Sequence, residues 1–360
     1  MKALIIHPFG LGDVIFSLPL LEALRTRLGA EVHYWANERT PELLALAGVK
    51  RVHVWNRDTM RAQYGRNPFA WLGGWWGTIS ALRKEKYDVC FDWSLGREYA
   101  ALAFLAGIPA RVGMDYRGRG KFLTHKLAFE SFELKSAREC GMELLRKWRP
   151  KEAQAAVLAT GYPAVQWPAD SERKFRQWLD SHGVANDERW VCMSPGGGAS
   201  WGKDAHYKQW APLKFAELAE RLAEEDDFRL ILLGSPSDEA LCREVAAHAR
   251  TARPIIVTGE SLEMAARILQ RSDLWIGNDG GLLHLADWIG TPLVGIYGPV
   301  SEKAYGPRPG RARTAVATAA VACRPCYGSF RFPPCAHQKI CLEHLSVDYV
   351  RAEALKLLHG

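Results

Sequence analysis

The sequence contains no long apolar run. Across its 360 residues no window holds eighteen consecutive apolar residues, so we expect no membrane-spanning helix. The opening segment, MKALIIHP, has one lysine and an apolar stretch that is too short for a secretory signal before Pro8 intervenes. The expected location is therefore the cytoplasm.

Acidic residues are fewer than basic ones. The chain has 40 Asp and Glu against 47 Lys and Arg, and this net charge of +7 favours anionic partners such as nucleic acid, a membrane surface or a phosphorylated substrate. The cations are dispersed along the chain instead of concentrated on one element, which disfavours a nucleic-acid-binding protein. The sequence also has no internal repeat and no low-complexity segment. An apolar fraction of 48% and a charged fraction of 24% are typical of a globular protein.

Segments with strand-like and helix-like patterns alternate along the chain, which predicts an α/β fold with parallel sheets. From about residue 147 to 170 the periodicity is lost and three prolines gather, so we place a domain boundary there. We expect two Rossmann-like, doubly wound domains, 1–165 and 166–345, that face each other across a cleft. The last segment, 346–360, reads as a capped amphipathic helix that packs back across the boundary.

The glycine-rich turn after the first strand lacks its third glycine. Gly10 and Gly12 begin the dinucleotide-binding pattern Gly-x-Gly-x-x-Gly, but the third position is Ile15. This argues against a nicotinamide-dependent oxidoreductase. Asp13, which follows at once, would repel a phosphate, and two interpretations remain open: an acid in the first turn of a helix, or a carboxylate held for acid–base chemistry.

Two loops in the second half carry residues suited to phosphate. The first, SPGGGASWGKDAHYKQW, contains three consecutive glycines that allow close backbone approach, and it holds Lys203 and Lys208 as cations. In the second, a strand ends at Asp279, Gly280 and Gly281 open a helix, and His284 lies in its first turn. Helix amides together with an imidazole at a strand exit form a good diphosphate cradle. We expect Asp279 to cap this helix.

Cysteines are sparse except in one tail segment. Four of the eight are scattered through apolar or helical contexts, and the other four form the pattern C-x2-C-x8-C-x5-C. In a reducing compartment this pattern favours a structural zinc or iron site over disulfides, with plain reduced thiols as the alternative. The four candidate ligands are Cys323, Cys326, Cys335 and Cys341.

The motifs together resemble the heptosyltransferase family, glycosyltransferase family 9. GLGDVIFSLPLLEALR, ARVG, PGGG…YKQW, VTGESL, NDGGLLHLADWIGTPLVGIYGP and the tail CLEHLSVDYV occur in the order seen in that family, over nearly the whole chain. The resemblance implies a GT-B fold, an ADP-heptose donor bound mainly by the second domain, and a lipopolysaccharide inner-core acceptor on the first. No acidic pair that resembles a divalent-metal site is evident near either motif, so we expect catalysis that requires no metal or other cofactor.

The resemblance also assigns roles to residues. The family's catalytic aspartate falls on Asp13 after Gly12, and the lysine of its Lys-x-Trp motif falls on Lys208, followed by Trp210. Its diphosphate-binding motif falls on Asp279, Gly281 and His284, while Gly280 replaces the Thr or Ser common in the family. Asp13 is then expected to act as general base in an inverting transfer.

Several alternatives stay open at this stage. Lys203 competes with Lys208 for the phosphate contact, and the nucleotide-sugar could differ from ADP-heptose or the acceptor could be a protein. Arginine-rich segments of the first half suit an anionic glycolipid, and the aromatic segment FAWLGGWWG is either core or a peripheral contact with the inner membrane. The basic residues in those segments are Arg57, Arg61, Arg66, Arg117, Arg119 and Lys121.

Overall fold

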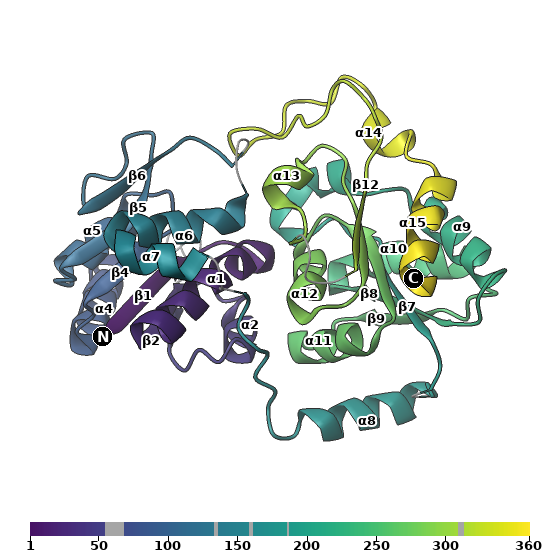
Figure 1. Ribbon diagram of the computed structural model, residues 1–360, viewed down its shortest axis with the longest axis horizontal. Coiled ribbons are helices and arrows are strands. Elements are labelled where there is room, and N and C mark those ends of the chain that lie inside the picture. Colours follow the sequence, from purple (N-terminus) through teal and green to yellow (C-terminus); the bar gives the residue numbers. More distant parts are fainter. Residues whose placement is uncertain (55–67, 133–135, 158–160, 186, 309–312) are drawn as a thin grey trace. The chain divides into compact units, whose positions relative to one another are not determined.

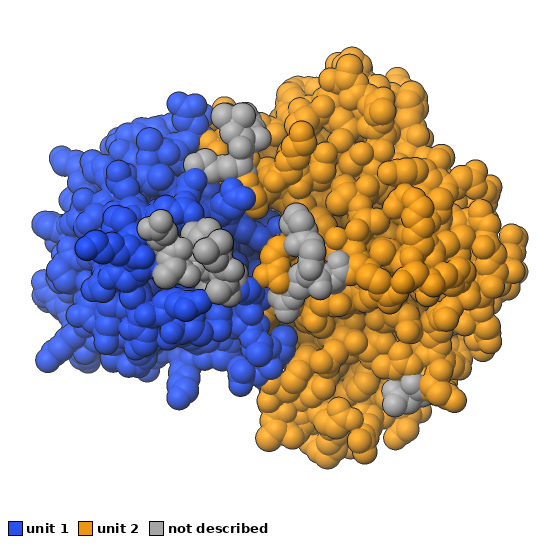
Figure 2. Space-filling view, in the orientation of Figure 1, with its two compact units in different colours: residues 1–130, 137–166 blue, residues 131–136, 167–360 orange. Residues whose placement is uncertain are grey.

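The computed structural model divides the chain into two compact units. Unit 1 comprises residues 1–130 and 137–166, and unit 2 comprises residues 131–136 and 167–360 (Figure 2). The structure describes residues 1–54, 68–132, 136–157, 161–185, 187–308 and 313–360. In these ranges no helix is both long and apolar enough to cross a bilayer.

Unit 1 is built on a six-stranded parallel sheet in the order β3-β2-β1-β4-β5-β6. Helices follow the strands along the chain, as expected for parallel crossovers (Figure 1). Its strands are β1 (Lys2–His7), β2 (Glu31–Ala36), β3 (Val52–Val54), β4 (Val89–Asp92), β5 (Ala110–Tyr116) and β6 (His125–Phe129). Its helices are α1 (Leu11–Leu28), α2 (Pro41–Leu46), α4 (Pro68–Glu85), α5 (Glu98–Leu105), α6 (Ala137–Trp148) and α7 (Pro150–Val157).

Unit 2 repeats this topology, with the sheet order β12-β11-β10-β7-β8-β9 and parallel pairing throughout. Its strands are β7 (Trp190–Ser194), β8 (Arg229–Gly234), β9 (Ile255–Thr258), β10 (Leu274–Asn278), β11 (Leu293–Ile296) and β12 (Thr314–Ala317). Its α-helices are α8 (Ser171–His182), α9 (Pro212–Ala223), α10 (Glu239–His248), α11 (Leu262–Arg271), α12 (Gly281–Ile289), α13 (Glu302–Tyr305), α14 (Ile340–Glu343) and α15 (Val347–His359). Two 3₁₀ segments, η1 (Ala199–Lys208) and η2 (Pro236–Asp238), complete it.

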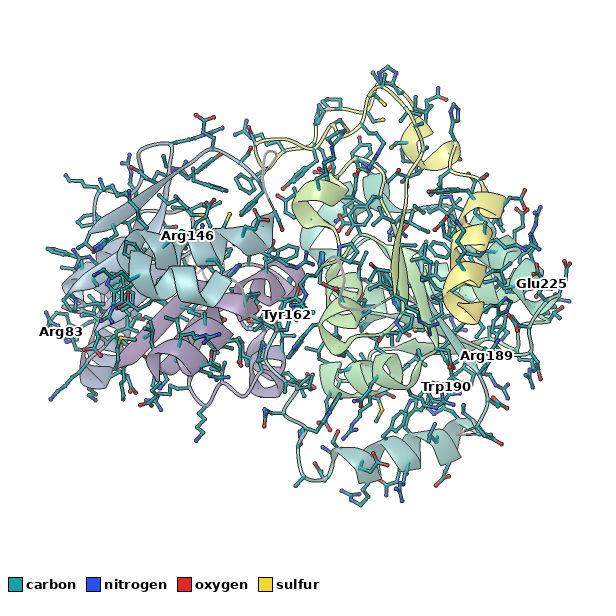
Figure 3. The ribbon with its side chains drawn as sticks, in the orientation of Figure 1. Arg83, Arg146, Tyr162, Arg189, Trp190 and Glu225 are labelled. Carbon is teal, nitrogen blue, oxygen red and sulfur yellow. The ribbon has the colours of Figure 1, made fainter. Side chains whose placement is uncertain are left out.

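Apolar side chains explain why each sheet is covered on both faces. The interior strands of both sheets are almost continuously buried, which is the pattern of parallel sheets sandwiched between helices. At the start of β7, Trp190 packs against Phe175 and Trp178 of α8 with ring centroids 6.1 and 6.2 Å apart (Figure 3). α8 thereby extends the core of unit 2.

The final helix, α15, belongs to unit 2. It packs on α9 and on strands β10, β11 and β12, with Val347, Val350 and Ala354 buried. The Lys214 ammonium of α9 donates to the carbonyl oxygens of Leu342, Glu343 and Leu345 just before it. These contacts place the apolar face of α15 in the core of unit 2, and the expected return of the helix across the domain boundary stays a prediction.

Candidate active site

The strand order gives each unit one point where it reverses. In a doubly wound sheet, ligands bind outside the carboxyl ends of the strands at the point where the strand order reverses. In unit 2 that point lies between β7 and β10, which end at Ser194 and Asn278. In unit 1 it lies between β1 and β4, and the loop after β1 leads into the helix that holds Asp13.

A buried ionic cluster stands at the switch point of unit 2. The Lys208 ammonium lies 2.7 Å from the Asp279 carboxylate, and His284 Nε2 lies 3.7 Å from the other carboxylate oxygen. All three side chains are about 95% buried. Burial alone would raise the pKa of Asp279, but Lys208 and His284 outweigh it and lower the pKa below its usual range.

This cluster changes the role expected of Asp279. The residue at the N-cap of α12 is Gly280, and the Asp279 carboxylate pairs with Lys208 beside it. A carboxylate in this place fixes the ammonium and the imidazole at the positive end of the helix dipole. Of the two rival lysines, Lys208 is thus the one with a defined position. The Lys203 side chain lies outside the described residues.

Asn278 holds the surrounding backbone together, a role that the motif analysis missed. Its side-chain oxygen accepts from the Trp210 amide at 3.0 Å, and its NH₂ donates to the carbonyl of Pro195 at 2.8 Å. One buried amide therefore joins the end of β10 to the glycine loop and to the segment that carries Lys208. The sequence feature that could have identified Asn278 is its position at the end of a strand, directly before Asp279.

The glycines of the site differ in what a side chain would meet. A Cβ on Gly197 would lie 2.5 Å from the backbone oxygen of Ala205, whereas a Cβ on Gly280 would have no atom nearer than 3.7 Å. Gly280 also has extended backbone, with φ of −178°, that any residue adopts. A side chain at position 197 would clash with the backbone, so this position requires glycine. Position 280 has room for the larger Thr or Ser that is common in the family.

We predict that Gly197→Ala lowers the melting temperature clearly, while Gly280→Ala does not. Overpacking against fixed backbone costs on the order of 1–3 kcal/mol, and Gly280→Ala makes only ordinary contacts. Thermal unfolding of the two variants beside the native chain measures the difference. Equal melting temperatures for both variants would contradict the assignment.

In unit 1, Asp13 occupies the third position of α1. Its carboxylate accepts from the backbone N–H of Gly10 at 3.3 Å, so it caps the helix that it begins. Gly12 lies beside it in the same turn, and the Asp13 side chain is partly exposed. The contact with Gly10 agrees with the interpretation of Asp13 as an acid in the first turn of a helix.

The basic residues expected to meet an acceptor divide into two groups. Arg117 and Arg119 are exposed after β5, where their guanidinium groups lie 4.9 and 5.5 Å from the Tyr116 ring centroid. Lys121 is exposed in the same loop. The other group, Arg57, Arg61 and Arg66, lies outside the described residues.

The tail thiols neighbour one another but do not form a tight ligand set. Burial raises the pKa of Cys341 to about 11, and the thiols of Cys326, Cys323 and Cys335 add to the shift. Across the residues that the structure describes, three or more potential ligand atoms come within 4.8 Å of one another in a single place, which is in unit 1. The metal site predicted for the tail stays a prediction.

Comparison with known proteins decides the family. The model of glycosyltransferase family 9 (heptosyltransferase) matches residues 75–331. The chain belongs to glycosyltransferase family 9. It is 23% identical to lipopolysaccharide heptosyltransferase 2 of Escherichia coli K12 over an alignment of 332 positions, which covers 87% of this chain and 87% of that one.

Solved structures show the fold of this family 9 enzyme. The E. coli ADP-heptose lipopolysaccharide heptosyltransferase II superposes with a TM-score of 0.76 at 21% identity, over 99% of this chain and 98% of that one. The E. coli heptosyltransferase WaaC with ADP superposes with a TM-score of 0.70 at 21% identity, over 99% and 100%. The two six-stranded parallel sheets are thus those of the GT-B fold, and the chain is a glycosyltransferase, as the sequence predicted.

Proposed function

We propose that this family 9 enzyme transfers a heptose from ADP-heptose to a lipopolysaccharide inner-core acceptor with inversion at the anomeric carbon. The observation that carries the proposal is the buried Lys208–Asp279–His284 cluster at the N-terminus of α12. Family membership supplies the sugar, and a related heptosyltransferase was solved with ADP.

The donor diphosphate is assigned to unit 2. The N-terminal amides of α12, at Gly280 and Gly281, carry partial positive charge, and Lys208 and His284 add donors beside them. Asp279 serves as a positioning residue, because its carboxylate orients both donors instead of meeting the phosphate. Gly12 is assigned to the donor side on the family resemblance alone.

The chemical step is assigned to Asp13. Its carboxylate takes the proton of the acceptor hydroxyl as that oxygen bonds to the anomeric carbon and the bond to the ADP phosphate oxygen breaks. The charge that develops on the departing diphosphate is met by Lys208, His284 and the α12 amides, which are fixed in advance. The scheme requires residues of both units to reach one pair of substrates, and it invokes no cofactor.

We extend the proposal to the place where the enzyme works. A glycolipid acceptor is presented by a membrane, so a cytoplasmic enzyme would touch the inner membrane peripherally. Of the paired tryptophans on α4, Trp75 packs against the core of unit 1 and Trp76 is 67% exposed. Arg83, two turns along the same helix, is also exposed. An aromatic ring with a nearby cation suits a lipid interface, and Trp76 with Arg83 fits that description. The side chains of residues 68–72 of the aromatic segment lie outside the described residues.

We predict that ADP stabilises the purified protein more than UDP, GDP, CMP or NAD at equal concentration. A ligand at a hundred times its dissociation constant adds about 2.7 kcal/mol, which a thermal melt resolves. The measurement is the melting temperature with each nucleotide. A preference for UDP or GDP would retain the fold and the base but discard ADP-heptose, and stabilisation by NAD alone would favour an oxidoreductase.

The tail cysteines form a separate part of the proposal. Four thiols within one segment would bind zinc or iron as thiolates and pin a loop rich in proline. A Co²⁺ titration followed by absorption tests whether these cysteines bind a metal, because thiolate ligands give intense near-ultraviolet charge-transfer bands.

A further inference from the structure

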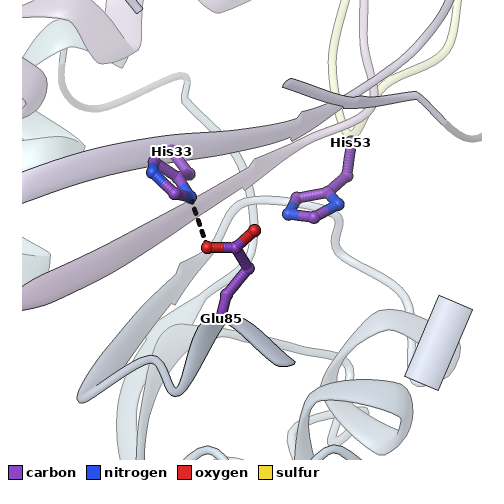
Figure 4. A group of neighbouring side chains, drawn as sticks. All are labelled: His33, His53 and Glu85. Atoms are coloured by element: carbon purple, nitrogen blue, oxygen red, sulfur yellow. Dashed lines mark ion pairs between the residues drawn. The ribbon is translucent and has the colours of Figure 1, made fainter. Parts of the chain in front are cut away.

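Two histidines and a glutamate converge in unit 1, away from the residues assigned to catalysis. His33 lies on β2, His53 on β3 and Glu85 at the end of α4 (Figure 4). One ligand atom of each lies within 4.8 Å of the others, and no other group of three in the described ranges does so. The three elements are far apart in the sequence, so no motif indicated this cluster.

Hydrogen bonds fix the orientation of His33. Its Nε2 lies 2.9 Å from a carboxylate oxygen of Glu31, which can only accept, so this nitrogen carries the proton. The other ring nitrogen, Nδ1, then has a lone pair directed at the cluster, 2.8 Å from the Tyr87 hydroxyl and 3.8 Å from Glu85. A carboxylate behind a histidine is the arrangement that orients histidine ligands in metal sites.

The Tyr87 hydroxyl brings the second histidine to the same point. His53 Nε2 lies 2.7 Å from that hydroxyl, which has one proton for two ring nitrogens. Tyr87 therefore donates to His33 and accepts from His53 Nε2. A metal ion can take this nitrogen of His53 once its proton has moved to Nδ1 of the same ring. His33 and Tyr87 are 4% exposed, whereas His53 and Glu85 are half-buried.

We propose that His33, His53 and Glu85 bind a divalent transition-metal ion of the zinc class. Two imidazole nitrogens and one carboxylate oxygen are a ligand set that zinc accepts, with a fourth position left for water or Tyr87. Glu85 is held by Lys2 at 3.0 Å and Arg51 at 2.8 Å, and a dication takes the place of these two cations. Both can turn into solvent, since their side chains are 34% and 58% exposed.

The role of this ion is structural. His33 is the third residue of β2, and Glu85 ends the helix that leads into β4, so the cluster sits toward the amino ends of the strands. Asp13 follows the carboxyl end of β1. An ion at the cluster joins β2, the short strand β3 and α4, and it binds whether or not the chain transfers heptose.

The test is a Co²⁺ titration of the tag-free, EDTA-treated full-length protein, followed by absorption and by thermal melting. We expect an ion to bind with weak visible bands and to raise the melting temperature, separately from any ion that the tail cysteines bind with an intense thiolate band. His53→Gln with Glu85→Gln should abolish this binding, while His248→Gln with Glu244→Gln on exposed α10 should leave it unchanged.

A milder variant keeps the test decisive if the double substitution does not fold. Glu31→Gln retains all three ligands and removes only the carboxylate behind His33, so affinity should fall about 10–100-fold. Equal affinity in native protein and Glu31→Gln, or cobalt bound with a thiolate band alone, overturns the proposal. The second result would assign the metal to the tail cysteines.

Discussion

Asp13→Asn is expected to reduce heptose transfer by about 10²–10⁴-fold, the range typical of losing a general base. An amide cannot take the acceptor proton, yet its oxygen can still accept from Gly10 N–H, so the cap on α1 persists. The melting temperature and the affinity for ADP should therefore stay near native values. The measurement is kcat and KM with ADP-heptose and a truncated core acceptor.

The matched control replaces another acid in the first turn of a helix in unit 1. Glu42→Gln, at the start of α2, removes a favourable charge near a helix dipole in the same way but lies outside the proposed machinery. It should retain native turnover. Full activity of Asp13→Asn, or an equal loss in both variants, would show that Asp13 is a helix cap and nothing more.

Lys208→Met is expected to have the second large effect, on stability and on donor binding together. Removing one partner of a buried ion pair leaves the Asp279 carboxylate uncompensated, which costs about 3–5 kcal/mol. For a unit of this size the melting temperature falls by on the order of 10 °C. Binding of ADP should weaken by more than tenfold, because the same ammonium is assigned to the diphosphate.

Two further variants separate these effects. Lys174→Met breaks the ion pair with Asp170 on α8, which is nearly half exposed on both sides, and should change little. Lys208→Met combined with Asp279→Asn removes both charges and should recover much of the stability but not the affinity for ADP. If the double variant binds ADP as the native chain does, the pair is structural.

The pH dependence of stability tests the Lys208–Asp279 ion pair independently. The pKa of Asp279 is lower in the folded chain than the unfolded value of about 3.9, so its contribution to stability is complete above that value. This contribution of Asp279 to stability is lost as the pH falls through the lower pKa that the residue has in the folded chain. The stability gap between native protein and Lys208→Met should therefore be widest above about pH 4 and close in more acidic solution.

Patterning predicted most of the fold, and its failures are local. Ten strands could be located because they are short, apolar and bounded by turn residues. The two missed strands, β6 and β12, lie at sheet edges, where only one residue of each strand is fully buried and the apolar signal is weak. Helix α7 lies inside the segment 147–170, which was expected to lack regular structure.

Candidates for the residues of the site could be named from the sequence, but the sequence did not predict which of these residues contact one another. Resemblance to the family placed Lys208 and Asp279 in separate motifs, and their pairing follows from a strand order that no local pattern reveals. Asn278 and the His33 cluster were missed for the same reason, since each joins segments from different elements. Spacing identifies chemistry within a loop, whereas topology decides which loops meet.

The placement of α15 bears on how the chain is synthesised. The core of unit 2 is closed by the last helix, whose Val350 and Ala354 are fully buried, so this unit cannot finish folding until that helix has left the ribosome. Unit 1 is complete once residue 166 has emerged, and domains fold as units during translation. The nascent chain therefore carries a folded unit 1 ahead of an unfinished unit 2 until α15 has emerged.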